Sequence, residues 1–319
     1  MLNNKSPKYD IYLFGNEAGI NILFDILEKI FFSKGHKVRR LNKFDYKEIL
    51  KLKFSLNDRW ILGYDSWDEL DNLLVFLKKQ KVLTFGLLDA WKGLFRFYKS
   101  DMKPKEMTDF LFVFDNKLKL FFEEKEIKTQ IVVVENPLLN KILNTSKTKR
   151  KIIRENTEKK FELDKSKKNL VLISEPISKR IDENFYDYKS IENLSDNNNL
   201  LKIIEEKYKD NYNLILRQHP VEKEIDNINW HNANFINEEQ TLFLGDLFLG
   251  VGSTFLILAK IAGFSIVLVN KLVKWIPNNG NYHSDIWDHV ENNLLSKTSD
   301  ENINNYISKL KIDEFVLST

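Results

Sequence analysis

Short apolar runs alternate with amphipathic stretches along the first half of this chain, and this alternation limits the possible folds more than any other feature. Such a pattern is typical of βα units built on a parallel sheet. Residues 20–34 carry an apolar stripe with helical spacing, and Gly35 follows where a helix would end. Helices are expected between the strands, which we predict at 10–15, 36–41, 60–64, 81–87, 110–114 and 131–135.

A second series begins after a lysine-rich, helix-prone stretch that runs from Pro137 to about residue 160. Its expected elements are strands at 169–174, 213–217, near 233–236, at 247–251 and at 265–270. Helices are expected near 189–209 and at 254–262, the second of them ended by Gly263. The sequence therefore predicts an α/β fold of two Rossmann-like domains, and 319 residues suit two domains of about 150 residues each. We place these domains at 1–150 and 165–300, and a tail at 301–319 with a helix near 301–311.

Composition narrows the functional classes. The 49 basic and 46 acidic residues nearly cancel, so the net charge of +3 gives no electrostatic reason to expect nucleic acid as a partner. No cysteine occurs, which removes disulfides, thiolate zinc sites and thiol nucleophiles. Without a signal-peptide core or an apolar stretch long enough to span a bilayer, a cytoplasmic location is expected. The basic cluster 147–151 could contact anionic lipid at the inner membrane face, or simply be solvated.

The dipeptide His219-Pro220 closes the apolar run 213–217. Proline lacks an N–H and cannot continue a central strand, so the strand must stop here. In an open parallel sheet ligands lie beyond the carboxyl ends of the strands, which places His219 at that crevice. An imidazole there can donate to a phosphate oxygen or to a leaving group. The alternative is a histidine that only caps the end of the strand.

The segment Gly250-Val251-Gly252-Ser253-Thr254 has the second pattern of this kind. Gly250 and Gly252 would let the backbone approach a ligand, while Ser253 and Thr254 would supply hydroxyl and N–H groups at the start of a helix. A helix N-terminus is a ready anion site. In the alternative interpretation Ser253 is an ordinary N-cap and the glycines only form a tight turn.

Together, His219-Pro220 and Ser253-Thr254 resemble the HP motif and the following serine/threonine motif of bacterial CMP-sugar-dependent GT-B enzymes, the Kdo transferases and sialyltransferases. The resemblance covers chiefly residues 213–270. It implies two domains facing a cleft, with the acceptor on the first domain and the nucleotide sugar on the second. In those families the histidine and the hydroxyls hold the CMP phosphate. On this basis we assign donor binding to Arg217, Pro220, Gly252, Ser253 and Thr254, with His219 also catalytic. His283 follows the last strand expected in the second domain, so we assign it to the nucleotide pocket as well, with an ordinary loop as the alternative.

One position separates this chain from many GT-B enzymes that use UDP-sugars. Those enzymes carry a glutamate about five residues after the serine pair, which holds the ribose. Leu258 occupies that position here. The departure favours a CMP donor over a UDP donor, and the alternative is a ribose contact from elsewhere in the chain.

The segment 85–97 resembles an Asp-x-Trp pattern of bacterial polysaccharide-synthesis proteins, with an arginine a few residues on. Asp89 would act as the base for the acceptor hydroxyl or as a nucleophile. Trp91 would stack on a sugar ring, and Arg96 would pair with the carboxylate of an acidic sugar. Glu17 could replace Asp89 as the carboxylate in the cleft. Alternatively Asp89 is a helix cap, Trp91 core, and Arg96 and Glu17 surface residues.

Absent motifs complete the prediction. The chain has no Asp-x-Asp triad and no H-E-x-x-H spacing, so we expect no metal and no cofactor beyond the donor. The glycine spacing of a dinucleotide site is missing as well. The favoured function is transfer of Kdo or sialic acid from CMP to a capsule or lipopolysaccharide acceptor. The alternatives are a CDP-glycerol or CDP-ribitol phosphotransferase of teichoic-acid type and a non-catalytic nucleotide- or glycan-binding protein.

Overall fold

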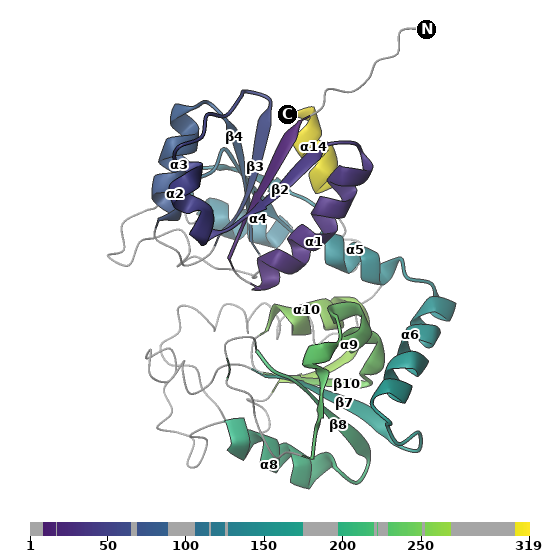
Figure 1. The fold of residues 1–319 in the computed structure, drawn as a ribbon. Helices are drawn as coiled ribbons and strands as arrows, with labels where there is room; N and C mark the ends of the chain where they lie inside the picture. The colour runs from purple at the N-terminus through teal and green to yellow at the C-terminus, as the bar shows by residue number, and fades with distance from the viewer. Residues whose placement is uncertain are drawn as a thin grey trace, which may run out of the picture. The chain divides into compact units, whose positions relative to one another are not determined.

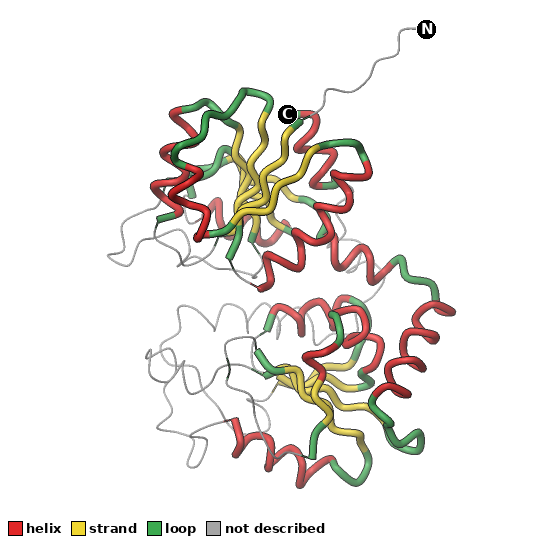
Figure 2. The backbone as a smooth tube through the Cα atoms, in the orientation of Figure 1, coloured by secondary structure: helices red, strands yellow, loops and turns green. Residues whose placement is uncertain are grey.

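The computed structural model divides the chain into two compact units, residues 1–140 with 299–319 and residues 141–298. It describes residues 9–16, 18–64, 69–88, 106–114, 116–124, 127–174, 197–219, 222, 229–250, 253–268 and 310–319. Each unit contains one parallel β-sheet flanked by helices (Figures 1 and 2). The predicted α/β fold of two Rossmann-like domains is confirmed.

The first unit is built on a six-stranded sheet of order β2-β1-β3-β4-β5-β6. Its strands are β1 (Asp10–Phe14), β2 (Lys37–Leu41), β3 (Asp58–Gly63), β4 (Leu83–Leu87), β5 (Phe110–Val113) and β6 (Gln130–Val133). Its helices are α1 (Ala18–Ser33), η1 (Lys43–Asp45), α2 (Tyr46–Ile49), α3 (Leu70–Lys79), α4 (Asn116–Glu124), α5 (Pro137–Leu143) and α14 (Ile312–Ser318). All six predicted strands are present, with ends shifted by only a residue or two.

The central strands form continuous apolar runs in the sequence because both of their faces are buried. Every residue of β3 is buried, as expected for a central strand with helices on both faces. The α1 stripe that includes Ile20, Phe24 and Leu27 is buried against this sheet. Gly35 ends the helix region with φ of 83°, a left-handed conformation that favours glycine. The helix predicted at 20–34 is therefore confirmed together with its end signal.

The second unit contains a five-stranded sheet of order β11-β10-β7-β8-β9. Its strands are β7 (Lys168–Ile173), β8 (Tyr212–Arg217), β9 (His231–Asn232), β10 (Leu247–Gly250) and β11 (Ser265–Leu268). Its helices are α6 (Lys147–Lys160), α8 (Asn197–Tyr208), η4 (Ala233–Phe235), α9 (Glu238–Leu244) and α10 (Thr254–Ile261). Gly263, at φ of 90°, follows α10 as the sequence predicts.

One predicted strand lies earlier than expected. The short strand expected near 233–236 is β9 at 231–232, and residues 233–235 form the short helix η4. The side chain of Asn232 accepts a hydrogen bond from the N–H of Asn234 at 2.9 Å and so caps this turn. Asparagine often competes with strand pairing in this way, because its side chain bonds its own backbone two residues on.

The lysine-rich helix α6 packs against α9 of the second unit. Arg154 forms two hydrogen bonds of 2.8 Å with the carboxylate of Asp246. The Asp246 carboxylate in turn accepts the N–H of Asn169 at the start of β7. These contacts place residues 147–150 with the second unit, so the units divide earlier along the chain than the proposed boundary between 150 and 165.

The C-terminal helix α14 returns to the first unit, where it lies beside α1 (Figure 1). The ring of Phe315 makes edge-on contacts with Phe85, Phe110 and Phe112 of β4 and β5, at centroid distances of 6.4, 5.2 and 5.8 Å. Asp313 is buried and pairs with Lys34. The helix expected near 301–311 falls mostly outside the described residues, and α14 begins just after it.

Candidate nucleotide site at the carboxyl edge of the second sheet

Strand register brings the two predicted motifs to one edge of the second sheet. Gly250 of β10 pairs with Ile173 of β7, and Ile173 pairs with Arg217 of β8. His219 and Ser253 follow these strands, so both emerge at the carboxyl edge on either side of β7. Neighbouring strands lie ~4.8 Å apart, which separates β8 from β10 by ~10 Å. This is the edge at which open parallel sheets bind ligands.

A buried hydroxyl and a carboxylate hold the backbone at His219. Its N–H donates to Glu222 at 2.7 Å and lies 3.2 Å from the hydroxyl oxygen of Ser174. The Ser174 hydroxyl donates to the same Glu222 carboxylate, and the N–H of Glu222 donates to the carbonyl of His219 at 2.9 Å. The chain therefore turns back on itself directly after β8. His219 starts from a fixed backbone position at the edge.

The electrostatics of this turn are unusual for a glutamate. Burial raises the pKa of Glu222, whereas the hydrogen bonds from Ser174 and from the His219 N–H act in the opposite direction. Ser174 is itself only 4% exposed. Neither Ser174 nor Glu222 was predicted as a site residue. Their signals were a serine directly after the apolar run 169–173 and a glutamate three residues after His219.

Ser253 is the N-cap of α10, since its hydroxyl accepts the N–H of Phe255 at 3.3 Å. The N-cap interpretation of Ser253 is thereby confirmed. Thr254 is the first residue of α10. The first N–H groups of this helix point out of its N-terminal end at the carboxyl edge, where they can bind an anion. A phosphate role for Ser253 and Thr254 stays a prediction.

Packing gives a reason for glycine at position 250, and approach of its backbone to a ligand stays a prediction. A Cβ at this position would lie 2.8 Å from the Leu256 side chain and 2.9 Å from the carbonyl oxygen of Ile173. The absence of a side chain thus allows α10 to pack on β7 and β10. Leu258 is 5% exposed, so the position where other enzymes carry a ribose-binding glutamate faces the interior here.

Arg217 interacts with its own domain. Its guanidinium donates to Thr241 at 2.7 Å and to the Ile236 carbonyl at 3.0 Å, and it pairs with Glu238. These bonds use three of the five N–H donors of the group. Burial lowers the pKa of Arg217, and Glu238 opposes this shift. Through these bonds, Arg217 links η4 and α9 to the end of β8. Donor binding by Arg217 stays a prediction.

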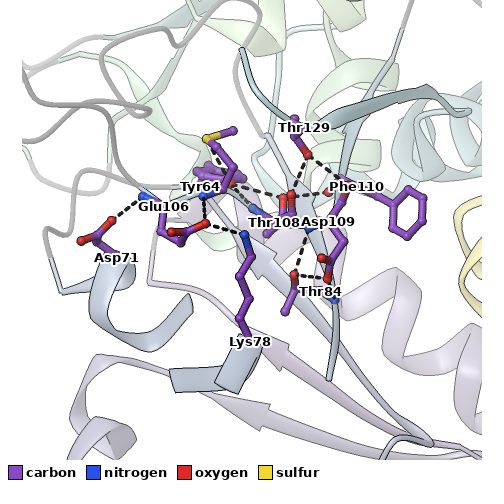
Figure 3. Close-up of polar contacts among 10 residues, drawn as sticks. Tyr64, Asp71, Lys78, Thr84, Glu106, Thr108, Asp109, Phe110 and Thr129 are labelled. Carbon is purple, nitrogen blue, oxygen red and sulfur yellow. Dashed lines mark hydrogen bonds and ion pairs between the residues drawn. The ribbon is translucent and has the colours of Figure 1, made fainter. Parts of the chain in front are cut away.

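The remaining predicted site residues lie outside the described residues: Glu17, Asp89, Trp91, Arg96, Pro220, Gly252 and His283. Further along the chain, hydrogen bonds to Tyr64 and Thr84 hold Thr108 and Asp109 in place (Figure 3). The buried Tyr64 hydroxyl accepts the N–H of Thr108 at 2.9 Å, and Asp109 accepts both the N–H and the hydroxyl of Thr84. Burial raises the pKa of Tyr64 to about 12, so this phenol stays protonated at neutral pH.

The basic cluster 147–151 lies at the start of α6, with the lysine side chains exposed. Arg150 does not share that exposure, because it donates to the carbonyls of Ile142, Leu143 and Thr145 at the end of α5. No helix in the described part of the chain has the length and apolar character needed to cross a bilayer. Contact with a membrane surface stays a prediction.

Metal ligands do not gather in the described ranges, where no three histidine, aspartate or glutamate side chains come close enough to hold an ion. Metal independence and the absence of a cofactor stay predictions.

Comparison with known proteins identifies the fold. No family model and no curated protein matches this chain. The wall teichoic acid polymerase TagF is similar with a TM-score of 0.53 at 12% identity, over 98% of this chain and 87% of TagF. UDP-GlcNAc 2-epimerase from Neisseria meningitidis, bound to UDP-GlcNAc, is similar with a TM-score of 0.51 at 11% identity, over 98% and 93% of the two chains. The chain has the two Rossmann-like domains of these GT-B structural neighbours.

Proposed function

We propose that this chain is a glycosyltransferase that moves an acidic sugar, Kdo or sialic acid, from a CMP donor to a cell-surface glycan. One observation carries the proposal: register places His219 and the N-terminus of α10 at the same carboxyl edge, on either side of β7. The spacing of ~10 Å between their strands leaves room for a phosphate group between them. The neighbouring epimerase structure contains a nucleotide sugar, which supports this class of ligand.

In the proposed reaction the second domain stabilises the leaving group. The N–H groups at the start of α10 and the Ser253 hydroxyl bind the phosphate of CMP, and His219 neutralises the charge that develops as the bond to the sugar breaks. Ser174 and Glu222 keep His219 in position through its backbone. Asp89, assigned from sequence, takes the proton of the acceptor hydroxyl or attacks the anomeric carbon. No metal or cofactor is required in this scheme.

A second candidate is transfer of glycerol phosphate or ribitol phosphate from a CDP-activated donor. The presence of TagF among the structural neighbours favours it, including a TagF variant soaked with CDPG. Both reactions release CMP, and they differ in the electrophile, which is carbon for sugar transfer and phosphorus for the phosphotransfer. The same edge would bind the cytidine phosphate in either case.

Parallel titration of CMP, UDP and GDP tests the nucleotide, followed by incubation with CMP-Kdo, CMP-sialic acid and CDP-glycerol and mass analysis of the products. We expect preferential CMP binding and consumption of one CMP-sugar. Consumption of CDP-glycerol alone would select the second candidate. Binding of CMP without consumption of any donor would indicate a non-catalytic protein, and preference for UDP or GDP would contradict both transfer proposals.

A further inference from the structure

The first unit contains a cavity of about 340 Å³ at the carboxyl ends of β1 and β2. This volume lies near the lower limit for small-molecule pockets. The side chains around it come from the segment after β1, from α1, from β2 and from η1. They are Asn16, Asn21, Arg40, Asn42, Lys43 and Phe44.

Backbone contacts fix the frame of this cavity. The Asn16 side-chain oxygen accepts the N–H of Lys43 at 2.7 Å, which ties the segment after β1 to the start of η1. The Asn42 side-chain oxygen accepts the N–H of Phe44 at 2.8 Å, and Asp45 accepts the N–H of Asn42 in a capping box. The walls are therefore positioned in advance, which reduces the entropy cost of binding a ligand.

Amide donors remain available in this frame. The side-chain oxygens of Asn21 and Asn42 accept hydrogen bonds from Arg40 and Phe44. Within the described part of the chain, the amide nitrogens of these two asparagines donate no hydrogen bond. Each amide nitrogen has two N–H groups. The cavity thus offers several neutral donors to a ligand.

The charges at the cavity are largely compensated. The Arg40 guanidinium donates to Asp25 at 2.9 Å and lies 3.7 Å from Glu28. An anion here would meet a cation that already faces two carboxylates. Lys43 is exposed, with its amine 5.5 Å from the centroid of the Phe44 ring. Solvent weakens the attraction of such an exposed charge for a ligand. The arrangement suits hydroxyl groups better than phosphate.

Phe44 adds an apolar surface at the rim. Its side chain is 85% exposed, the highest value among the exposed large apolar residues described in the structure. Exposed single apolar residues are common on proteins, but this one borders a cavity with amide donors. The C–H face of a pyranose ring can pack on an aromatic ring while its hydroxyls reach polar groups at the side.

We propose that this cavity binds a neutral sugar unit, with the sugar ring on Phe44 and its hydroxyls on the amides of Asn21 and Asn42. The inference rests on the proposed function and deepens it, because it locates a sugar contact in the unit to which the glycan acceptor is assigned, and nothing at the cavity requires a nucleotide. It would give the chain a glycan contact that is independent of donor binding.

Saturation-transfer NMR on the full chain tests the proposal, with the methyl β-glycosides of glucose, galactose and N-acetylglucosamine as probes and inorganic sulfate and CMP as anionic competitors. We expect at least one glycoside to bind with a dissociation constant in the millimolar range. Phe44→Ala should weaken binding at least fivefold. Asn42→Asp should do the same, because it retains the capping oxygen but removes the amide donors.

Phe235→Ala is the matched control, since Phe235 is 73% exposed on η4 of the second unit. It should leave glycoside binding unchanged. Absence of binding by all three glycosides, unchanged binding in Phe44→Ala, or displacement by sulfate would each overturn the proposal. A His219→Ala variant that loses CMP but keeps the glycoside would separate the two sites. Loss of glycoside binding with CMP binding intact would leave the proposed function standing.

Discussion

The carboxyl edges of the two sheets differ in the chemistry that they present. The second edge combines the N-terminus of α10 with a histidine held by Ser174 and by the partly buried carboxylate of Glu222. At the first edge, asparagine amides surround a cavity, and Arg40 is already paired with carboxylates. The same parallel-sheet architecture can therefore present groups suited to an anion in one domain and groups suited to hydroxyls in the other.

The largest expected effect tests the second edge directly. His219→Ala should lower the rate of transfer at least ~100-fold, in the range that general acid groups contribute. Asp89→Ala should have an effect of similar size. Rates are measured by CMP release, with thermal unfolding to verify that the variants fold. His231→Ala is a histidine control within the same unit and should retain most activity. Near-normal turnover in both His219→Ala and Asp89→Ala would refute the proposed mechanism.

Gly250 and Gly15, at the carboxyl edges of the second and first sheets, differ in the atoms that an added Cβ would meet. A Cβ on Gly250 would meet the backbone oxygen of Ile173 at 2.9 Å, whereas a Cβ on Gly15 would meet the side chains of Ile20 and Phe24. Side chains can adjust more easily than a strand backbone. We expect Gly250→Ala to lower the free energy of unfolding by about 2 kcal/mol and Gly15→Ala by less. Urea denaturation measures both, and an equal or larger loss in Gly15→Ala would contradict this ranking.

Glu222 tests whether the second edge depends on a fixed backbone. Glu222→Ala removes the nearer of the two acceptors of the His219 N–H and should lower the transfer rate about tenfold, because small displacements of a reacting group are costly. Glu222→Gln retains an acceptor oxygen and should stay within about threefold of the wild-type rate. Equal losses in the two variants would assign the effect to the charge instead of the position.

The pH dependence of stability in wild type and in Glu222→Gln is an independent test of this carboxylate. The pKa of Glu222 is raised in the folded state, so its contribution to stability is present below the unfolded pKa and is lost as pH rises through the folded value. Glu222→Gln should therefore be at least as stable as wild type at pH 7. The difference should shrink toward acidic pH in thermal unfolding experiments.

The smallest effect concerns the opposite edge of the second sheet. Burial would raise the pKa of Asp246, but hydrogen bonds from Arg154 and the Asn169 N–H outweigh it and lower the pKa. The stability from this carboxylate is present above its unfolded pKa and is lost as pH falls through the folded value. Asp246→Asn should cost about 1 kcal/mol at pH 7, given the partial exposure of the pair. A difference from wild type that does not shrink as pH falls below the unfolded pKa of aspartate would argue against this origin.

The elements that sequence predicted well are those specified locally. Apolar spacing and the left-handed glycines Gly35 and Gly263 act within one helix or strand, and both helix ends are confirmed. Ser174 and Glu222 could not be recognised in the same way, because their contact depends on β7 and β8 being neighbours in the sheet. The packing role of Gly250 could not be predicted for a similar reason, since the atoms that a Cβ would meet come from β7 and α10.

The candidate site residues also divide into those specified by local sequence and those whose contacts come from distant parts of the chain. The positions of His219 and Ser253 at a strand end and at a helix start could be predicted from proline and from capping chemistry. The engagement of Arg217 could not, because its partners Glu238 and Thr241 lie in α9, three elements further along the chain. Sequence locates the edge of a sheet better than it tells which side chains at that edge are already bound.

The packing of Phe315 on Phe85, Phe110 and Phe112 has a consequence for biosynthesis. The aromatic face formed by β4 and β5 is translated long before α14, and the whole second unit is made in between. Until α14 has been synthesised, that face has no native cover from this helix. A nascent first unit should therefore gain resistance to protease late, after α14 has left the exit tunnel, even though most of its residues emerge early.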